Sequence, residues 1–338
     1  MTPSNIRLTA TEIGGLWSTF MNDSMVKCML QYFLGHVEED SLRSVLEFAL
    51  NFSTGNLAEL NELFRRERFP IPQGFSESDV DTRAPRLYTD CLIMQYIKNM
   101  SDVGLITYAN AYASASRPDI RAFFLANLDK SKVLQDKIVT LLDETGQHVH
   151  PPSISIPERI QTSVHEDFFS GHLFGWGDKR VLTSVEIGQL YKNAKSNWLG
   201  NALLLGFAQV AKEKELRDHM VRGIEISKAH AEFFESKLQE DHIPFPSSWD
   251  NEVTASTKAP FSDKLMLYHV TLLVATGTAN YGVALAVSPR SDLAIGYGKL
   301  TLQIANYAKD GAKLLVQHHW FEAPPLADDR KALTETLT

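Results

Sequence analysis

Apolar residues recur every three or four positions along most of the chain, which is the spacing of one face of an α-helix. In the first half, such stretches cover about 9–37, 41–66, 87–114 and 118–146, with polar turns and prolines between them. At a rise of about 1.5 Å per residue, helices of roughly 25 to 30 residues are about 40 Å long. Four helices of this length are typical of a four-helix bundle.

The same pattern starts again in the second half of the chain. The sequence LTATEIG at 8–14 returns as LTSVEIG at 182–188, a shift of 174 positions (182 minus 8). The shift is 173 at the far end, where Pro151-Pro152 corresponds to Pro324-Pro325 (324 minus 151). A register kept over this length indicates a tandem duplication.

The duplication sets the expected architecture. We expect an all-α protein that is a tandem duplication of two four-helix bundles. The first bundle should cover 1–147, an inter-repeat linker 148–181, and the second bundle with a C-terminal tail 182–338. The linker is rich in prolines, glycines and aromatic residues, including FGWGD at 174–178, so we expect it to pack across the junction between the bundles.

Each bundle is expected to open with a capped helix, because the pattern T-x-x-E occurs at Thr9–Glu12 and at Thr183–Glu186. Between the second and third helices, FPIP at 69–72 and IPFP at 243–246 end the helix, and a polar linker follows. The length of this linker allows either a connection between antiparallel helices or a long crossover between parallel ones.

Composition narrows the class of protein. The chain has 338 residues, 44% of them hydrophobic, and a formal net charge of -8, which argues against a nucleic-acid-binding surface. The two cysteines, Cys28 and Cys91, lie in apolar helical stretches, which predicts free thiols in a reducing compartment. The N-terminal residues lack the basic and apolar regions of a secretory signal, so we expect a cytoplasmic protein.

The third helix of the second repeat is unusually apolar. Residues 265–288 contain no charged side chain and are long enough to cross a bilayer of about 30 Å. Polar residues such as Asn280 interrupt the stretch, so we expect a helix buried on most sides and no membrane span. Small residues leave one side of this helix nearly bare: Ala275, Ala279, Gly282 and Ala286. We expect this stripe to be covered by the other repeat or, in a homo-oligomer, by a second subunit.

The common catalytic motifs GxxxxGK, GxGxxG after a strand, GxSxG and HExxH are absent from the sequence. Four-helix bundles often carry a dinuclear metal site built from glutamates and Glu-x-x-His motifs. No glutamate of this chain has a histidine three positions after it. We therefore favour a protein without catalytic residues and without a resident cofactor.

Polar residues on apolar helix faces are the remaining candidates for a site. Helical spacing points His230 and His269 inward, and imidazole is a ligand of zinc and iron. If a metal binds, Asn197 and Asp310 are the nearest candidates to complete the site. A shared ion needs antiparallel second and third helices, because a long crossover separates the two histidines by about 13 Å along the bundle. The alternative is that both histidines form hydrogen bonds inside a core.

The first repeat lacks these imidazoles, so its site should stay empty; its corresponding residues are Asp23, Asn56, Tyr96 and Asp136. A further set of histidines lies at the ends of the fourth helices: His148, His150, His318 and His319. A cation at that place suits the helix dipole, and an exposed metal cluster is the alternative.

Motifs spread over nearly the whole chain carry a resemblance to a known family. They are the repeated L-T-x-x-E-I starts, MNDSM at 21–25, FPIPQGF at 69–75, SWDNEVT at 248–254 and PPLADDRK at 324–331. On these motifs the chain resembles an uncharacterised family of duplicated helical domains from Bacillus-like spore formers, sometimes labelled spore-coat-like. The resemblance implies a ferritin-like four-helix bundle in each half and no established activity.

Taken with the missing motifs, the resemblance favours a non-catalytic structural or interaction protein associated with sporulation. The alternative is a bundle that binds a transition metal, iron or zinc, or a small ligand, with the site in the second repeat.

Overall fold

The computed structural model describes residues 6–160, 166–169 and 180–335. Eight long helices account for most of these residues: α1 Ala10–His36, α2 Asp40–Arg66, α3 Asp90–Ser114, α4 Pro118–Glu144, α5 Ser184–Val210, α6 Lys214–Glu240, α7 Asp263–Val287 and α8 Ser291–Gln317. The short elements are the 3₁₀ turns Glu77–Asp79, Glu166–Phe169 and Asp250–Glu252, and the C-terminal helix α9 Arg330–Glu335. Within the described part of the chain, extended pairing is limited to two isolated bridges, so the all-α prediction is confirmed.

The start of each bundle is fixed by the predicted capping box. The Thr9 hydroxyl accepts from the Glu12 N–H at 3.3 Å, and the Glu12 carboxylate accepts from the Thr9 N–H at 2.8 Å. The same carboxylate also accepts from the backbone N–H groups of Ser116 and Arg117, in the turn between α3 and α4. One buried glutamate therefore holds together three helix ends of the first bundle, and Glu186 occupies the same place in the second.

The connection between α2 and α3 is a long crossover. The Asp90 carboxylate at the start of α3 accepts from the N–H groups of Glu38 and Glu39, which precede α2. Both helices therefore start at the same end of the bundle and run parallel. Asp263 makes the same contacts to Lys212 and Glu213 in the second bundle. Of the two connections that the sequence allowed, the structure has the crossover.

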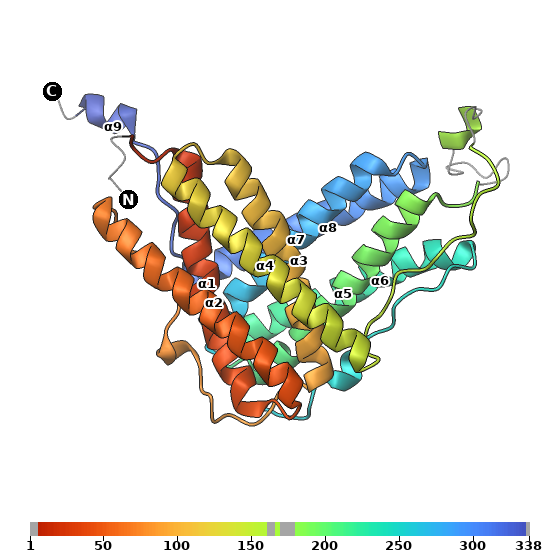
Figure 1. The fold of residues 1–338 in the computed structure, drawn as a ribbon, viewed down its shortest axis with the longest axis horizontal. Helices are drawn as coiled ribbons and strands as arrows, with labels where there is room; N and C mark the ends of the chain where they lie inside the picture. Colours follow the sequence, from red (N-terminus) through yellow and green to blue (C-terminus); the bar gives the residue numbers. More distant parts are fainter. Residues whose placement is uncertain (1–5, 161–165, 170–179, 336–338) are drawn as a thin grey trace.

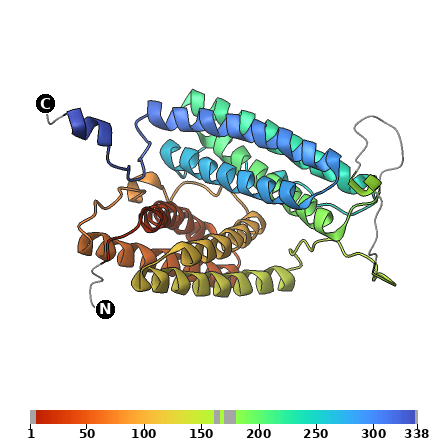
Figure 2. The ribbon, with the colours of Figure 1, turned by 90° about the horizontal axis from the view of Figure 1, so that it is seen from above.

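The two crossovers lie against each other and join the bundles. They meet in antiparallel bridges between Val80 and Phe261 and between Tyr88 and Val253. Tyr88 is 1% exposed, and its hydroxyl donates to the Leu203 carbonyl of α5 at 2.8 Å. The bundles diverge from this junction and form a V (Figure 1), and from above they lie as two neighbouring layers (Figure 2). Residues of both bundles share one continuous core across the junction.

Helix α7 is largely buried in its first half, and one face of its second half is exposed although Tyr281 and Ala284 remain buried. Leu265, Met266 and His269 are buried, whereas the predicted stripe at Ala275, Ala279, Gly282 and Ala286 is exposed. The expectation that the other repeat covers this stripe is therefore wrong within one chain, because the bundles diverge at this level (Figure 1). Among the described residues, α7 is the one helix whose length and composition would let it cross a membrane. In the fold it packs against α5 and α8 as a member of the second bundle.

The segment between the bundles is described only in part. Helix α4 ends at Glu144 and α5 begins at Ser184, on either side of the predicted linker. The expected packing of FGWGD at 174–178 falls outside the described residues. Cys28 and Cys91 are free thiols, as predicted; the first is buried and the second is half-buried.

Candidate functional site

Each bundle contains a polar cluster with one residue from each of its four helices, and the cluster runs from the buried core toward the surface. The positions match by the repeat shift: Asp23 and Asn197 on the first helices, Asn56 and His230 on the second, Tyr108 and Tyr281 on the third, and Lys130 and Gln303 on the fourth. The differences are 174 for the first two pairs (197 minus 23, 230 minus 56) and 173 for the others (281 minus 108, 303 minus 130). The duplication thus kept a polar centre and changed its chemistry.

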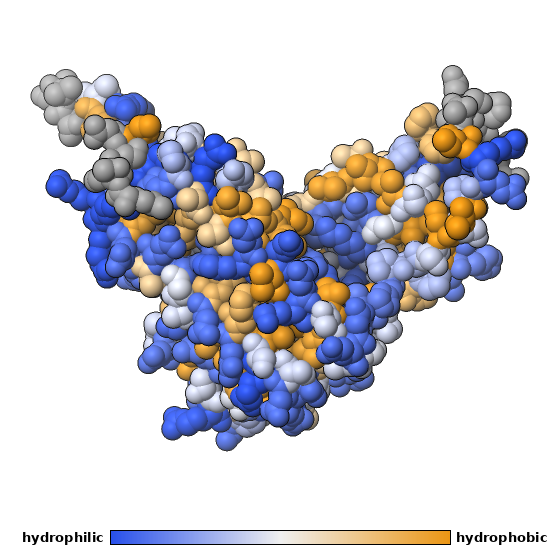
Figure 3. Space-filling model, in the orientation of Figure 1, coloured by the Kyte–Doolittle hydropathy of each residue, from blue (hydrophilic) through white to orange (hydrophobic). Residues whose placement is uncertain are grey.

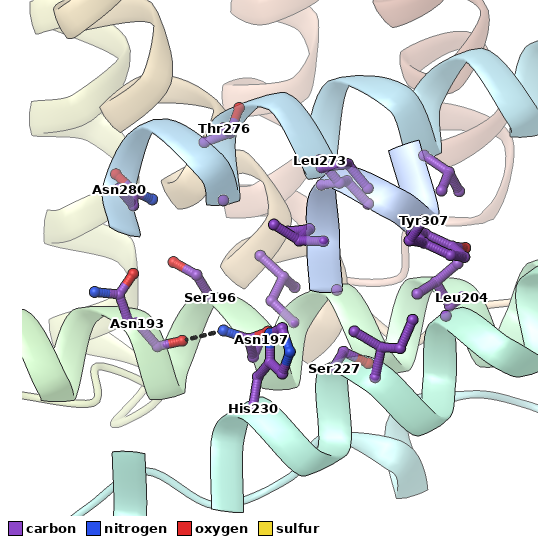
Figure 4. A pocket seen from close by; sticks show the side chains of 18 of the residues that line it. Asn193, Ser196, Asn197, Leu204, Ser227, His230, Leu273, Thr276, Asn280 and Tyr307 are labelled. Atoms are coloured by element: carbon purple, nitrogen blue, oxygen red, sulfur yellow. Dashed lines mark hydrogen bonds between the residues drawn. The ribbon is translucent and has the colours of Figure 1, made fainter. Parts of the chain in front are cut away.

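In the second bundle the cluster is neutral, and both ring nitrogens of His230 have a hydrogen-bond partner. The His230 ring contacts the Tyr281 hydroxyl through Nδ1 at 2.9 Å and the Gln303 Oε1 through Nε2 at 3.1 Å. Burial lowers the pKa of His230, so the ring is neutral, with Nε2–H donating to Gln303 and Nδ1 accepting from Tyr281. Asn197 donates to the Asn193 carbonyl at 2.7 Å and also contacts the Tyr281 hydroxyl. Figure 4 shows His230 and Asn197 of this cluster, with Asn193 and Asn197 joined by a hydrogen bond along α5.

In the first bundle the cluster is charged. The Asp23 carboxylate accepts from the Asn56 amide at 2.8 Å, and the Lys130 ammonium donates to the Asn56 Oδ1 at 3.3 Å. Burial raises the pKa of Asp23 to about 7, although the Asn56 hydrogen bond and the Lys130 charge act in the opposite direction. Lys130 also lies over the Phe52 ring, 5.2 Å from its centroid. A carboxyl group that titrates near neutral pH inside a bundle is a frequent feature of functional sites.

A cavity adjoins each cluster, and the two cavities differ in size. The first-repeat cavity has a volume of about 440 Å³ and the second-repeat cavity about 80 Å³. Larger side chains fill the second: Ile304 stands where the first repeat has Ser131, and Tyr307 where it has Leu134. Tyr307 fits only because α6 has Gly223 beside it, where a Cβ atom would lie 2.3 Å from the tyrosine hydroxyl.

The large cavity reaches from the core of the first bundle to helix α7 of the second. Its lining comes from α1, α2, α3, α4 and α7, and includes Asp23, Ala49, Phe52, Ser53, Gly104, Tyr108, Ser131, Leu134, His269 and Ala275. The deep part is formed by buried residues such as Asp23 and Ser53, and the rim by exposed residues such as Ser18 and Thr107. A space-filling view shows the surface hollowed between the two arms of the V (Figure 3).

His269 is the buried histidine that the second repeat contributes to this cavity. Its side chain is buried between the rings of Tyr96 and Phe207, with centroid distances of 5.5 and 5.6 Å. Burial lowers the pKa of His269 to about 4, so the ring is neutral. Its Nδ1 atom has no hydrogen-bond partner among the described residues, which is uncommon for a buried polar atom.

A known protein family matches this chain in two segments, in agreement with the duplicated architecture. The sequence profile of DUF3231, described as a protein of unknown function, matches residues 1–160 and 172–333. The chain belongs to the DUF3231 family. The two matched segments correspond to the two bundles, so the tandem duplication and the resemblance to an uncharacterised family are confirmed.

Two further comparisons, with curated proteins and with solved structures, add no information on function. No curated protein matches this DUF3231 chain significantly. Among solved structures, a candidate spore coat protein from Bacillus halodurans is similar, with 19% sequence identity and a TM-score of 0.42. The match covers 45% of this chain and 98% of the other.

The residues predicted for a metal site in this DUF3231 protein do not meet at one point. His230 is level with Tyr281 on α7, and His269 lies twelve positions earlier on the same helix (281 minus 269), which is about 18 Å at 1.5 Å per residue. Parallel α6 and α7 cause this separation, so the structure does not place the two imidazoles on a shared ion. Asp310 is half-buried and pairs with Arg222 at 2.9 Å, whereas Asn197 does lie beside His230, since both contact the Tyr281 hydroxyl. Metal binding by these residues stays a prediction.

Proposed function

We propose that this DUF3231 protein binds a small, largely apolar molecule in the first-repeat cavity. The observation that carries the proposal is the cavity of about 440 Å³ with Asp23 and His269 in its lining. Cavities that bind small molecules measure about 300–1,000 Å³ and combine apolar walls with a few polar groups. The second-repeat cavity is well below this range.

The polar groups of the cavity favour a ligand that offers a hydrogen-bond donor. Asp23 presents carboxylate oxygens, only one of which receives the Asn56 amide. The serine hydroxyls of Ser53 and Ser131 already donate to backbone carbonyls of their own helices, and can only accept from a ligand. An amine or hydroxyl group on an apolar body would meet this set of acceptors.

The ligand site can be tested by filling the first-repeat cavity with the residues of the second repeat. Installing its residues at three cavity positions, as A49G/S131I/L134Y, should fill the space, because glycine, isoleucine and tyrosine already pack together at the equivalent places Gly223, Ile304 and Tyr307. The triple variant is expected to lose binding of 1-aminoanthracene, a fluorescent apolar amine, by at least about tenfold. Its free energy of unfolding should rise by about 0.5–2 kcal/mol, as is common when a cavity is filled. Fluorescence titration and chemical denaturation measure the two effects.

A control variant shows whether the loss is local. D136N alters an exposed side chain of α4 outside the cavity and should bind the probe as the wild type does. Equal probe affinity in the triple variant, with its fold intact by circular dichroism, would contradict a ligand site in this cavity.

We also propose that a second copy of the chain covers the exposed face in the second half of α7, which makes the protein an interaction module as well. The exposed apolar residues there are Val283 at 55%, Leu285 at 40% and Val287 at 39%, beside the small-residue stripe. Leaving apolar surface in water forfeits about 25 cal/mol for each square ångström, and contiguous exposed patches mark association surfaces.

Cytoplasmic or spore-associated localisation stays a prediction.

The association can be tested by placing a charge in the stripe. A279E is expected to shift the protein from dimer to monomer, because a carboxylate in an apolar contact loses its hydration. Light scattering after size exclusion measures the molar mass, and A305E at an exposed position of α8 serves as the charge-matched control. A monomeric wild type at micromolar concentration would refute the second copy.

A further inference from the structure

A compact group of potential metal ligands lies at the end of α4, away from both cavities. The Nδ1 atom of His148 is 2.6 Å and the Nε2 atom of His150 is 3.5 Å from Oδ1 of Asp143. The two imidazole rings lie 4.0 Å apart by their centroids, and one ligand atom from each residue lies within 4.8 Å of the others. Among the described residues, this is the one such group of three.

We propose that Asp143, His148 and His150 bind one divalent transition-metal ion, with zinc as the best fit. Zinc bonds histidine nitrogen and carboxylate oxygen at about 2.0–2.2 Å, so its ligand atoms lie about 3.4 Å apart in a tetrahedral site. The His150–Asp143 distance of 3.5 Å matches this value, and the 2.6 Å contact between His148 and Asp143 is a hydrogen bond that an ion would replace. Three protein ligands leave a fourth position for water, so the site is open.

The backbone holds the three ligands in place. Gly146 ends α4 with a φ of 67°, and the N–H of His148 turns back to the Leu142 carbonyl at 3.0 Å. The neighbouring Gln147 carbonyl accepts from Gln95 of α3 at 2.8 Å. The His150 carbonyl accepts from the Tyr191 hydroxyl of α5 at 2.9 Å. The ligands therefore sit on a segment fixed by both bundles, which reduces the ordering cost of binding an ion.

The site is present once in each chain. By the shift of 173, the second repeat has Val316, Phe321 and Ala323 at these positions, none of which is a metal ligand. Because Tyr191 belongs to the second bundle, an ion at this site would tie the end of the first bundle to the second. Metal binding should consequently raise the thermal stability of the whole chain, by mass action on the folded state.

The experiment uses the full chain without a polyhistidine tag, after treatment with EDTA. Calorimetric titration with Zn²⁺ should show one equivalent bound, and Co²⁺ should give the visible absorption of a low-coordinate site. H150Q and D143N are each expected to weaken Zn²⁺ binding by at least about tenfold, since each removes one of three ligands. The His150 side chain is 69% exposed, so its replacement leaves the packing unchanged.

His318 provides the matched control, because it lies at the end of α8, in the second repeat, and its one carboxylate neighbour among the described residues is Glu215, at 4.0 Å. H318Q should retain the wild-type affinity for Zn²⁺ and the same Co²⁺ spectrum. Two results would overturn the assignment: no binding of either ion at 100 µM, taken as about a hundredfold above a micromolar dissociation constant, or equal affinities in the wild type and in the H148Q/H150Q double variant.

Discussion

Replacing Glu12 by glutamine is expected to lower the free energy of unfolding by about 3–5 kcal/mol, in the range of other losses at a buried charge. Glu12 is 1% exposed, and its carboxylate accepts from Thr9 and from the N–H groups of Ser116 and Arg117. In glutamine, the side-chain NH₂ group would replace one of these acceptor oxygens, and it would face the backbone N–H groups that the carboxylate now accepts from. The helix ends that Glu12 joins would then keep unpaired buried N–H groups, each costing about 1–3 kcal/mol.

The same carboxylate gives this prediction a pH dependence. Burial alone would raise the pKa of Glu12, but the hydrogen bonds from Arg117, Thr9 and Ser116 bring it below the ordinary value of 4.5. A folded-state pKa below the unfolded value stabilises the protein above pH 4.5, and this contribution is lost as the pH falls below 4.5. Urea denaturation at pH 7 and at lower pH should therefore show a difference between wild type and E12Q that shrinks with acidity.

Glu59 offers the comparison for E12Q. It is exposed on α2, so E59Q should change the free energy of unfolding by no more than about 0.5 kcal/mol. A loss in E12Q as small as that in E59Q would mean that the carboxylate does not hold the helix ends together.

Local signals in the sequence were sufficient for the helices and their duplication. The T-x-x-E starts and the proline stops predicted helix ends that the structure has, because caps and prolines act within a few residues. The direction of α3 was open, since a linker of that length can connect helices either way. The structure decides it through Asp90, whose contacts to Glu38 and Glu39 depend on the folded arrangement.

The candidate site was only partly accessible from sequence. The repeat shift correctly matched Asn56 with His230 and Asp23 with Asn197 as inward polar positions. The members from the third and fourth helices were missed, although the shift of 173 relates Tyr108 to Tyr281 and Lys130 to Gln303. The larger cavity depends on the volumes of side chains from several helices at once. The spacing of apolar residues along one helix shows which way each side chain points, but not how much of the space between the helices it fills.

The contact between Tyr88 and Gly206 also could not be foreseen, because it joins the crossover of one repeat to a helix of the other. A Cβ atom on Gly206 would lie 2.5 Å from the Tyr88 ring and hydroxyl, far inside van der Waals contact. The equivalent place in the first bundle holds Tyr32, which packs against Phe261 with ring centroids 5.1 Å apart. The two contacts at the junction are therefore not equivalent. On one side a tyrosine of the crossover packs against a glycine of the helix, and on the other side both the crossover and the helix contribute an aromatic ring.

Introducing leucine at position 206 is therefore expected to destabilise the protein by about 3–5 kcal/mol. Overpacking of a rigid core costs about 1–3 kcal/mol, and displacing Tyr88 also removes the buried hydrogen bond to Leu203. Thermal denaturation would measure the loss, with G188L as the control, since Gly188 is an exposed glycine of the same helix with open space around it. Because the clash involves one partner, Y88A should recover part of the loss in G206L, and strictly additive effects in this double-mutant cycle would show that the two positions do not contact each other.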